Sequence, residues 1–286
     1  MKHNYLMLLL IASMVSLSLV ACEKDPNNNN SDNNQSENGK PVVEMINDAV
    51  TDIDGNHYNA VKIGKQVWMS ENLKTKHYAD GTEIPVAVHV VGNIGYRQAS
   101  ATNPYLYVEN SSYLYNWSAV MHGSNSSNAN PSGIQGVCPD GWHVPSWAEW
   151  QELKDYVSSY TQFQYDSCET CIGKSLAANS GWKEIHDDFY PGSVGYEQGS
   201  NNATGFSANP EGFMRTFIPY DTVVVHIGKN EFACFSSATK NNAEFMIAWL
   251  SGYGNGFRIQ SSDSLWYYGD HIIDEISGLS VRCVRN

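Results

Sequence analysis

The chain has 286 residues, of which 42% are hydrophobic and 12% aromatic, so it is long enough to bury a substantial core. Its 17 Lys and Arg residues face 30 Asp and Glu residues, which gives a formal net charge of −13 at pH 7. An acidic chain repels phosphate backbones and anionic headgroups, so its charge argues against nucleic acid or anionic lipid as a partner.

The first residues resemble a secretory signal that ends at a lipid-attachment cysteine. Lys2 precedes an apolar run from Leu6 to Val20, which has the length of a signal-peptide core and is shorter than a usual membrane span. The following Ala-Cys is similar to a bacterial lipoprotein box, with Cys22 as the lipidated residue. The alternatives are an uncleaved anchor and a plain signal peptide with a chance cysteine. We expect removal of residues 1–21 and a membrane anchor on Cys22.

A polar segment follows the cysteine. Residues 22–44 include EKDPNNNNSDNNQSENGK, which has no large apolar residue and cannot offset the entropy cost of folding. We expect a disordered tether there and one domain over residues 45–286. The acidic residues directly after the cysteine resemble the signals that carry Bacteroidetes lipoproteins to the outer face. The expected location is therefore the cell envelope, as a surface-exposed outer-membrane lipoprotein.

The domain begins with a stretch of β character, residues 47–73. Asp54 opens a DGN turn, and alternating residues around Gly64 predict a two-residue hairpin. The segment from Asp52 also resembles the start of a calcium loop, whose twelfth position requires an acidic residue. That position is Ile63, so we expect a turn and no metal site.

Residues 136–150, GVCPDGWHVPSWAEW, carry three groups with chemical potential. Cys138, His143 and Glu149 can be cast as nucleophile, base and orienting acid. The S-x-x-E pattern from Ser146 instead predicts a capping box at the start of a helix, which accounts for the glutamate. A packed histidine bonded to a backbone carbonyl is the matching structural interpretation. We expect no catalysis from this cluster.

Further along, the elements become short. A second helix is predicted in IGKSLAAN, within an otherwise irregular region. Strands are predicted for FMIAWL, FRIQ, LWYYG and the final LSVRCVR.

Several blocks together resemble the Fibrobacter succinogenes major paralogous domain. They are TDIDGNHYNAVKIGKQVWMSENL, YLYNWSAV, GVCPDGWHVPSWAEWQELKDYV, GKSLAANSGW, TGFSANPEGF, FSSATKNN and GLSVRCVRN. HVPSWAEW and VRCVR are more distantly similar to formylglycine-generating (sulfatase-modifying) enzymes. That likeness implies an α+β fold of the C-type-lectin-like mixed kind, with few helices, antiparallel strands, long loops and terminal strands close together.

The same resemblance implies a disulfide between Cys138 and Cys283, because it brings the helix start and the last strand together. Formylglycine chemistry needs a reactive cysteine pair, and Cys234 has no close partner in sequence, which argues against that activity. Cys168 and Cys171 form a C-x-x-C motif that fits half a zinc site, a redox pair or a disulfide. In an oxidising envelope we expect a local disulfide, or a pairing of one of them with Cys234.

We expect a non-catalytic binding role, for a glycan or for an envelope or host protein. Aromatic side chains stack on sugars, and loops rich in Asn, Ser, Gly and Tyr resemble adaptable recognition surfaces. Tyr253, Trp266 and Asn209 are the candidate ligand-binding residues. The alternatives are a surface enzyme acting on polysaccharide and a purely structural surface component. No cofactor or metal is expected.

Overall fold

Strands in several small sheets dominate the computed structural model. The α-helices of the described residues are few and mostly short: α1 (Trp117–Met121), α2 (Trp147–Ser158) and α3 (Gly173–Leu176). The protein therefore has an α+β fold. The structure describes residues 39–87, 103–109, 111–186, 191–216, 224–241, 244–261, 266–267, 270–271 and 276–286.

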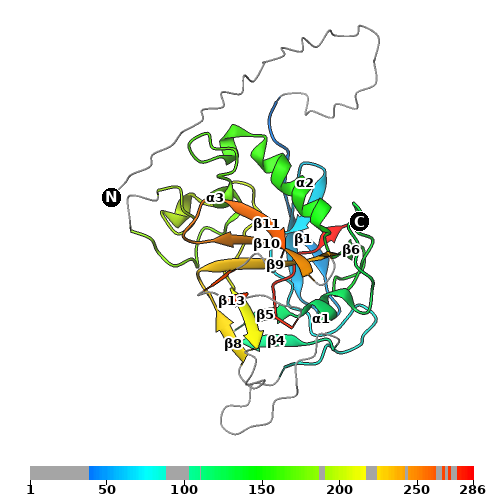
Figure 1. Cartoon of the computed structure of the whole chain (residues 1–286). Helices are drawn as coiled ribbons and strands as arrows, with labels where there is room; N and C mark the ends of the chain where they lie inside the picture. Colours follow the sequence, from blue (N-terminus) through cyan, green and yellow to red (C-terminus); the bar gives the residue numbers. More distant parts are fainter. Residues whose placement is uncertain are drawn as a thin grey trace, which may run out of the picture. The chain divides into compact units, whose positions relative to one another are not determined.

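The largest sheet has five antiparallel strands and joins the beginning of the domain to its end (Figure 1). Val284 lies opposite both Trp68 and His143, so the last strand is paired on both sides. The order in the sheet is β1 (Val43–Thr51), β2 (His57–Ile63), β3 (Gln66–Met69), β14 (Val284–Arg285) and β6 (Trp142–His143).

The predicted hairpin connects β2 to β3 through Gly64. This glycine has a φ of 62°, in the left-handed region that L side chains rarely adopt. A Cβ atom at Gly64 would also lie 2.8 Å from the ring of Tyr156. The turn therefore needs glycine both for its backbone conformation and for the close approach of α2.

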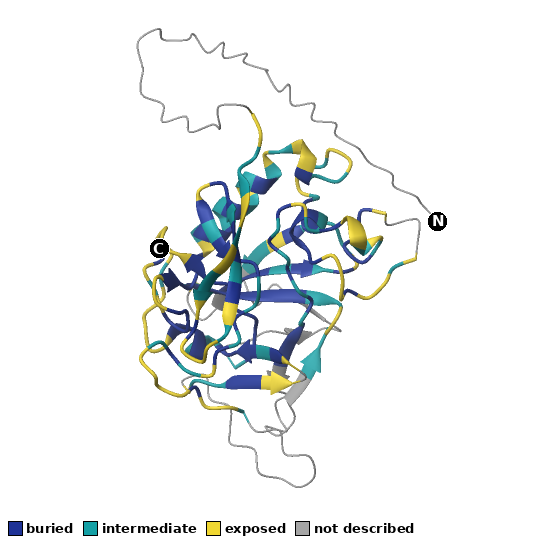
Figure 2. Cartoon of the chain, turned by 180° about the vertical axis from the view of Figure 1, so that it is seen from behind, coloured by how far each residue is buried: buried dark blue, intermediate teal, exposed yellow. Residues whose placement is uncertain are grey.

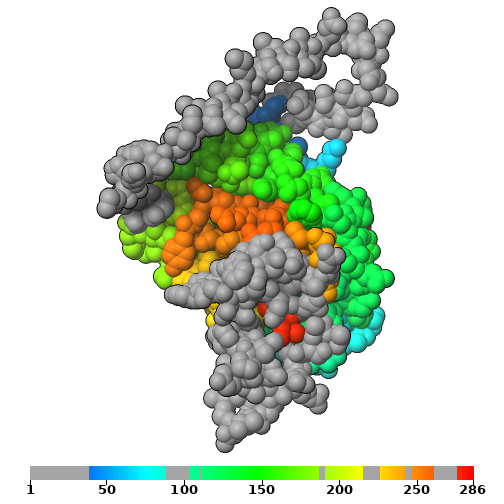
Figure 3. All heavy atoms as spheres, in the orientation of Figure 1, coloured from blue at the N-terminus to red at the C-terminus, as the bar shows by residue number. Residues whose placement is uncertain are grey.

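A second sheet has the order β11 (Phe257–Ser261), β10 (Glu244–Ser251), β9 (Phe232–Asn241). Helix α2 (Trp147–Ser158) packs against strands of both sheets, and Figure 3 shows the green atoms of α2 beside the orange atoms of β11. Trp150 of α2 reaches both sheets, with ring centroids 4.4 Å from Trp68 and 5.6 Å from Phe235. Figure 2 shows buried residues concentrated along the central strands and exposed residues mainly in the surrounding loops.

Three pairs of short strands and several short helices complete the described fold. The predicted helix in IGKSLAAN is reduced to one turn, because Ala177 is extended and pairs with Ala208. The predicted strand LSVRCVR is also shorter, with isolated bridges at Leu279 and Ser280 before β14. These elements are β4 (Leu106–Glu109), β5 (Ser112–Tyr115), α1 (Trp117–Met121), η1 (Thr161–Phe163), α3 (Gly173–Leu176), η2 (Gln198–Ser200), β7 (Phe213–Thr216), β8 (Val224–Ile227), β12 (Trp266–Tyr267) and β13 (Asp270–His271).

Arg282 ties the large sheet to the loop before β7. Its side chain is fully buried and donates hydrogen bonds to the carbonyl oxygens of Met69, Phe206 and Ser207 at 3.1, 2.5 and 2.6 Å. Burial lowers the pKa of Arg282 to about 9. The carbonyl oxygens and the ring of Phe206, 4.8 Å away, compensate the buried cation.

Within the described ranges, no helix combines the length and the hydropathy that crossing a bilayer requires.

Candidate functional site

A disulfide holds the corner formed by residues 136–150 to the chain directly before the last strand, β14. Cys138 and Cys283 form a disulfide with an S–S distance of 2.04 Å, and both residues are fully buried. A disulfide sulfur is not a thiolate, so Cys138 has no nucleophile to offer in this state.

His143 and Glu149 form a buried hydrogen-bonded pair. The Nε2 atom of His143 lies 2.6 Å from Glu149 Oε1, and its Nδ1 atom lies 2.6 Å from Asn286 Oδ1. Burial alone would lower the pKa of His143, but the hydrogen bond and charge of Glu149 outweigh it, so the pKa is raised above the ordinary value. The expected backbone-carbonyl partner is replaced by two side chains, and both ring nitrogens are occupied.

The second oxygen of Glu149 completes the predicted capping box. Glu149 Oε2 accepts the backbone N–H groups of Ser146 at 2.9 Å and Ser132 at 3.0 Å, while the Ser146 hydroxyl accepts the N–H of Glu149. The carboxylate therefore fixes the start of α2 and a neighbouring loop. Of the three groups of the catalytic interpretation, His143 and Glu149 contact each other, while Cys138 is part of the disulfide, so each group already has a structural role.

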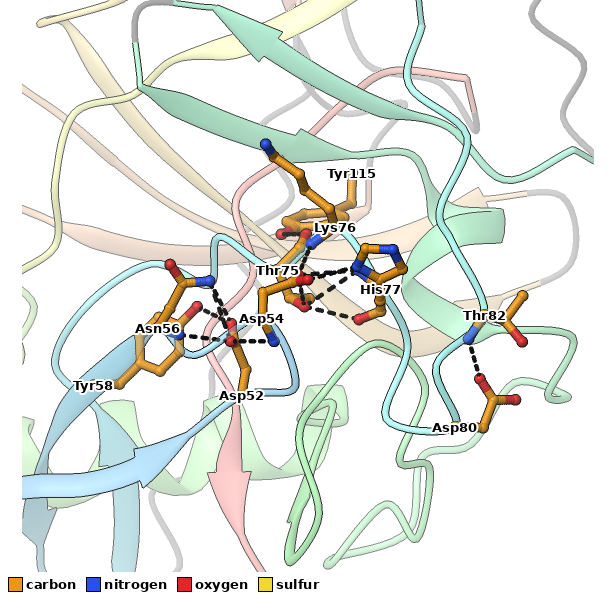
Figure 4. Close-up of polar contacts among 10 residues, drawn as sticks. All are labelled: Asp52, Asp54, Asn56, Tyr58, Thr75, Lys76, His77, Asp80, Thr82 and Tyr115. Carbon is orange, nitrogen blue, oxygen red and sulfur yellow. Dashed lines mark hydrogen bonds and ion pairs between the residues drawn. The ribbon is translucent and has the colours of Figure 1, made fainter.

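The calcium-like sequence forms a hydrogen-bonded turn (Figure 4). Asp52 Oδ1 accepts the backbone N–H groups of Asp54 at 3.0 Å and Asn56 at 2.9 Å. Asp52 Oδ2 accepts the hydroxyl of Tyr58 at 2.6 Å and the side-chain amide of Asn56 at 2.9 Å. The carboxylate is thus engaged by protein donors, as the turn interpretation expects.

Asp54 and His77 form the pair in Figure 4 that most resembles an acid–base dyad. Asp54 Oδ1 lies 2.5 Å from His77 Nδ1, and the other ring nitrogen points away from the cluster. Burial raises the pKa of Asp54, but hydrogen bonds from the Lys76 backbone, His77 and Thr75 outweigh this effect and lower it. A dyad of this kind can accept a proton, yet no hydroxyl or thiol among the described residues contacts the outward nitrogen. Its visible effect is to fasten the segment after β3 to the turn.

The other three cysteines of the described residues form one disulfide and one free thiol. Cys168 and Cys171 are bonded to each other, with an S–S distance of 2.07 Å. Cys234 is the unpaired cysteine of the described residues and is buried, which raises its pKa to about 12. Such a thiol stays protonated and unreactive at neutral pH.

A groove with a cavity volume of about 700 Å³ lies in the yellow-green loops after α3 (Figure 1). We call residues 179–186 its first wall and residues 195–199 its second wall. The walls present indole, phenol, carboxylate, imidazole, amide and hydroxyl groups. The lining side chains include Asn179, Trp182, Glu184, Tyr196, Glu197 and Gln198.

Hydrogen bonds hold the two walls at a fixed spacing. The Gln198 side chain donates to the carbonyl oxygen of Trp182 at 2.8 Å and accepts the N–H of Trp182 at 3.0 Å. The N–H of Ile185 donates to Gly195 at 3.1 Å. Buried Asn201 bridges the bases of the walls, because its Nδ2 atom donates to the carbonyl oxygens of Ala178 and Val194.

The sequence also matches the model of a known protein family. The family model of the Fibrobacter succinogenes major domain matches residues 61–285. The chain belongs to this family. No curated protein and no solved structure matches it. The C-type-lectin-like architecture and the similarity to formylglycine-generating enzymes stay predictions.

In this Fibrobacter major domain, Tyr253 lies beside the first wall of the groove. Its side chain is 47% exposed, and its hydroxyl donates to Glu231 at 2.9 Å. Lys183 of the first wall pairs with Glu231 at 2.8 Å and lies 5.6 Å from the centre of the Tyr253 ring. The N–H of Gly195 in the second wall donates to Gly252, so the loop before Tyr253 contacts both walls.

Asn209 is connected to the first wall through backbone hydrogen bonds made by its neighbour. It precedes Pro210, whose carbonyl oxygen accepts the N–H of Asn230, and the carbonyl oxygen of Asn230 accepts the N–H of Lys183. Neither Tyr253 nor Asn209 is among the residues that line the groove, and Asn209 is linked to the first wall through these backbone hydrogen bonds of its neighbours. The backbone of Trp266 belongs to β12, and its side chain lies outside the described residues.

Sequence reasoning missed the groove itself. The signal that indicates it is the glycine-rich PGSVGYEQGS of the second wall, close in sequence to the Gly181-Trp182 of the first. Glycine at 195 is required because a Cβ atom there would lie 2.5 Å from the carbonyl oxygen of Lys183. The sequence interpretation treated this region only as irregular.

Proposed function

We propose that this protein is a lipid-anchored, non-catalytic binding protein of the cell surface, and that its Fibrobacter major domain binds glycans in the groove. The observation that carries the proposal is the polar groove, held at fixed spacing and flanked by the exposed ring of Tyr253. Its volume falls within the roughly 300–1,000 Å³ range of small-molecule sites.

The chemistry of the walls fits a ligand rich in hydroxyl groups. Carboxylates and amides accept or donate hydrogen bonds to hydroxyls, and the side chains of Asn179, Glu184 and Glu197 are exposed for this purpose. Tyr196 and Tyr253 add aromatic surface on which the C–H faces of a sugar ring can pack. Rigid walls reduce the entropy cost of binding.

Anchoring is proposed from the sequence. We assign residues 1–21 as the signal, residues 22–44 as the lipidated cysteine with its tether, and residues 45–286 as the binding domain. Metabolic labelling with an alkyne-tagged fatty acid tests this assignment. The native protein should take the label and partition into membranes, and Cys22→Ala should lose both properties.

Binding is tested with the full mature chain purified in detergent, against soluble and insoluble polysaccharides. Glu197→Gln keeps the shape of the side chain but removes the charge at the groove, and should weaken binding by roughly fivefold to tenfold. Glu169→Gln is the matched control, because it makes the same change at an exposed position outside the groove lining.

Retention on no polysaccharide would refute the glycan role. Binding to an envelope or host protein with equal loss in Glu197→Gln would place a protein ligand in the groove instead. Release of reducing sugar from a bound polysaccharide would favour a surface enzyme.

A further inference from the structure

A second, smaller cavity adjoins the groove. It has a volume of about 240 Å³, and its lining includes Gln162, Tyr165 and Ala203. Tyr196 and Glu197 line both cavities. The two hollows are therefore neighbours that meet at one short stretch of chain.

The stretch between the cavities, residues 191–201, is fastened on each side by a different side chain. On the side of the second cavity, Lys174 donates to the carbonyl oxygens of Ser193, at 3.3 Å, and Tyr196. On the side of the groove, Gln198 bonds to the backbone of Trp182. Glu197 lies between these two sets of hydrogen bonds. Its backbone φ is 44°, and it lines both cavities.

Unpartnered polar atoms gather around the same stretch. Four buried side-chain atoms have no hydrogen-bond partner within the described ranges, and three of them are Trp182 Nε1, Ser193 Oγ and Asn201 Oδ1. Buried polar groups are nearly always hydrogen-bonded, so this concentration is unusual, and because the three atoms are enclosed they can meet a ligand only when the surrounding side chains move. Trp182 lines the groove, while Ser193 and Asn201 lie in the stretch that separates the two cavities.

The charges at the two cavities favour a neutral ligand. The groove lining contains two carboxylates, Glu184 and Glu197. The imidazole of His186 lies 3.3 Å from Glu184, and Lys183 of the first wall pairs with Glu231 outside the lining. The lining of the second cavity contains Lys174, but its ammonium group is directed to backbone carbonyl oxygens. Uronic acids, sulfates and phosphates would meet like charge in the groove.

We propose that the two cavities form one extended site for a linear, neutral oligosaccharide that crosses the chain at Tyr196 and Glu197. This inference rests on the proposed glycan-binding function and adds the ligand's shape, charge and place. Each cavity takes part of the oligosaccharide, and the ring of Tyr196 supports the junction. Affinity should therefore depend on chain length.

The test uses calorimetry with the full mature chain in detergent. The probes are the monomer, dimer, tetramer and hexamer of the cello-, manno- and chito-oligosaccharide series. In the series that binds, the tetramer should bind roughly tenfold more tightly than the dimer, because only the longer chain reaches both cavities. The oxidised uronate analogue of the same series should bind more weakly.

The substitution Ala203→Trp tests the contribution of the second cavity independently of the groove. Ala203 is exposed at the second cavity, so the indole fills that cavity without replacing a buried group. This variant should bind the dimer as the native protein does and should lose the tetramer advantage. Tyr196→Ala should lose the same advantage, and Glu169→Gln should keep it.

The outcomes distinguish this inference from the function on which it rests. Equal affinity for dimer and hexamer, or an unchanged tetramer advantage in Ala203→Trp, would overturn the extended site and leave glycan binding in place. Failure of every probe and of every polysaccharide to bind would overturn both.

Discussion

At the scale of single residues, His143 is enclosed by two acceptors at 2.6 Å, Glu149 Oε1 and Asn286 Oδ1. The imidazole, whose pKa is raised, joins the start of α2 to the residue that follows the last strand. Sequence reasoning assigned Glu149 to the helix cap and His143 to packing. It missed Asn286 as a partner, because 143 residues separate the two positions and no local pattern connects them.

The raised pKa of His143 predicts a pH-dependent stability. Its pKa is higher in the folded chain than the ordinary value of 6.5, so the pair contributes fully below about pH 6.5. The contribution is lost as pH rises through the folded-state pKa. Chemical unfolding of the native protein and of His143→Gln, compared at each pH, should show a difference in unfolding free energy that shrinks above about pH 6.5. A constant difference across that interval would contradict the charged pair.

At the scale of elements, local sequence signals predicted α2 and the β2–β3 hairpin. The S-x-x-E pattern at Ser146 and the glycine at position 64 act within a few residues, so they can be interpreted without knowledge of the rest of the chain. The IGKSLAAN helix was predicted too long. Its last residues pair with Ala208 instead, and a partner so far along the sequence overrides helix propensity.

The cap of α2 supplies a prediction at this scale. Ser146→Ala removes the hydroxyl that accepts the N–H of Glu149, at 3.2 Å, in a fully buried position. The free energy of unfolding should fall by about 1 kcal/mol, or somewhat more because of burial. Denaturant titration followed by tryptophan fluorescence measures this change.

Ser159→Ala at the other end of α2 is the matched control, because Ser159 is exposed and should cost less than about 0.5 kcal/mol. Equal losses in the two variants would mean that the capping box does not determine where the helix begins.

At the scale of the whole described fold, the groove is made by irregular loops within residues 178–201. Its walls depend on Asn201 bridging Ala178 and Val194, and on Gln198 pairing with Trp182. Neither contact has a periodic signature, which is why composition indicated recognition loops but not their arrangement. Tyr253 was selected for its chemistry and lies next to Lys183 of the first wall, while the roles of Tyr253 and Asn209 in ligand binding stay predictions.

The Cys138–Cys283 disulfide gives a prediction at the same scale. It spans 145 residues, and the chain-entropy model assigns a loop of that length about 5 kcal/mol of stabilisation. Replacing both cysteines by alanine should lower the unfolding free energy by about that amount, as measured by urea titration.

The paired replacement of Cys168 and Cys171 is the control, because a loop of three residues predicts only about 1.5–2 kcal/mol. A larger loss in the control than in the Cys138 and Cys283 variant would contradict the entropic account.

Strand β14 lies between β3 and β6 in the main sheet. A chain truncated before residue 284 leaves one edge of β3 unpaired and leaves β6 without its partner strand in this sheet. Unpaired strand edges can pair with other chains, so such a truncated product should be prone to aggregation. Closure of the main sheet therefore depends on its two-residue strand β14.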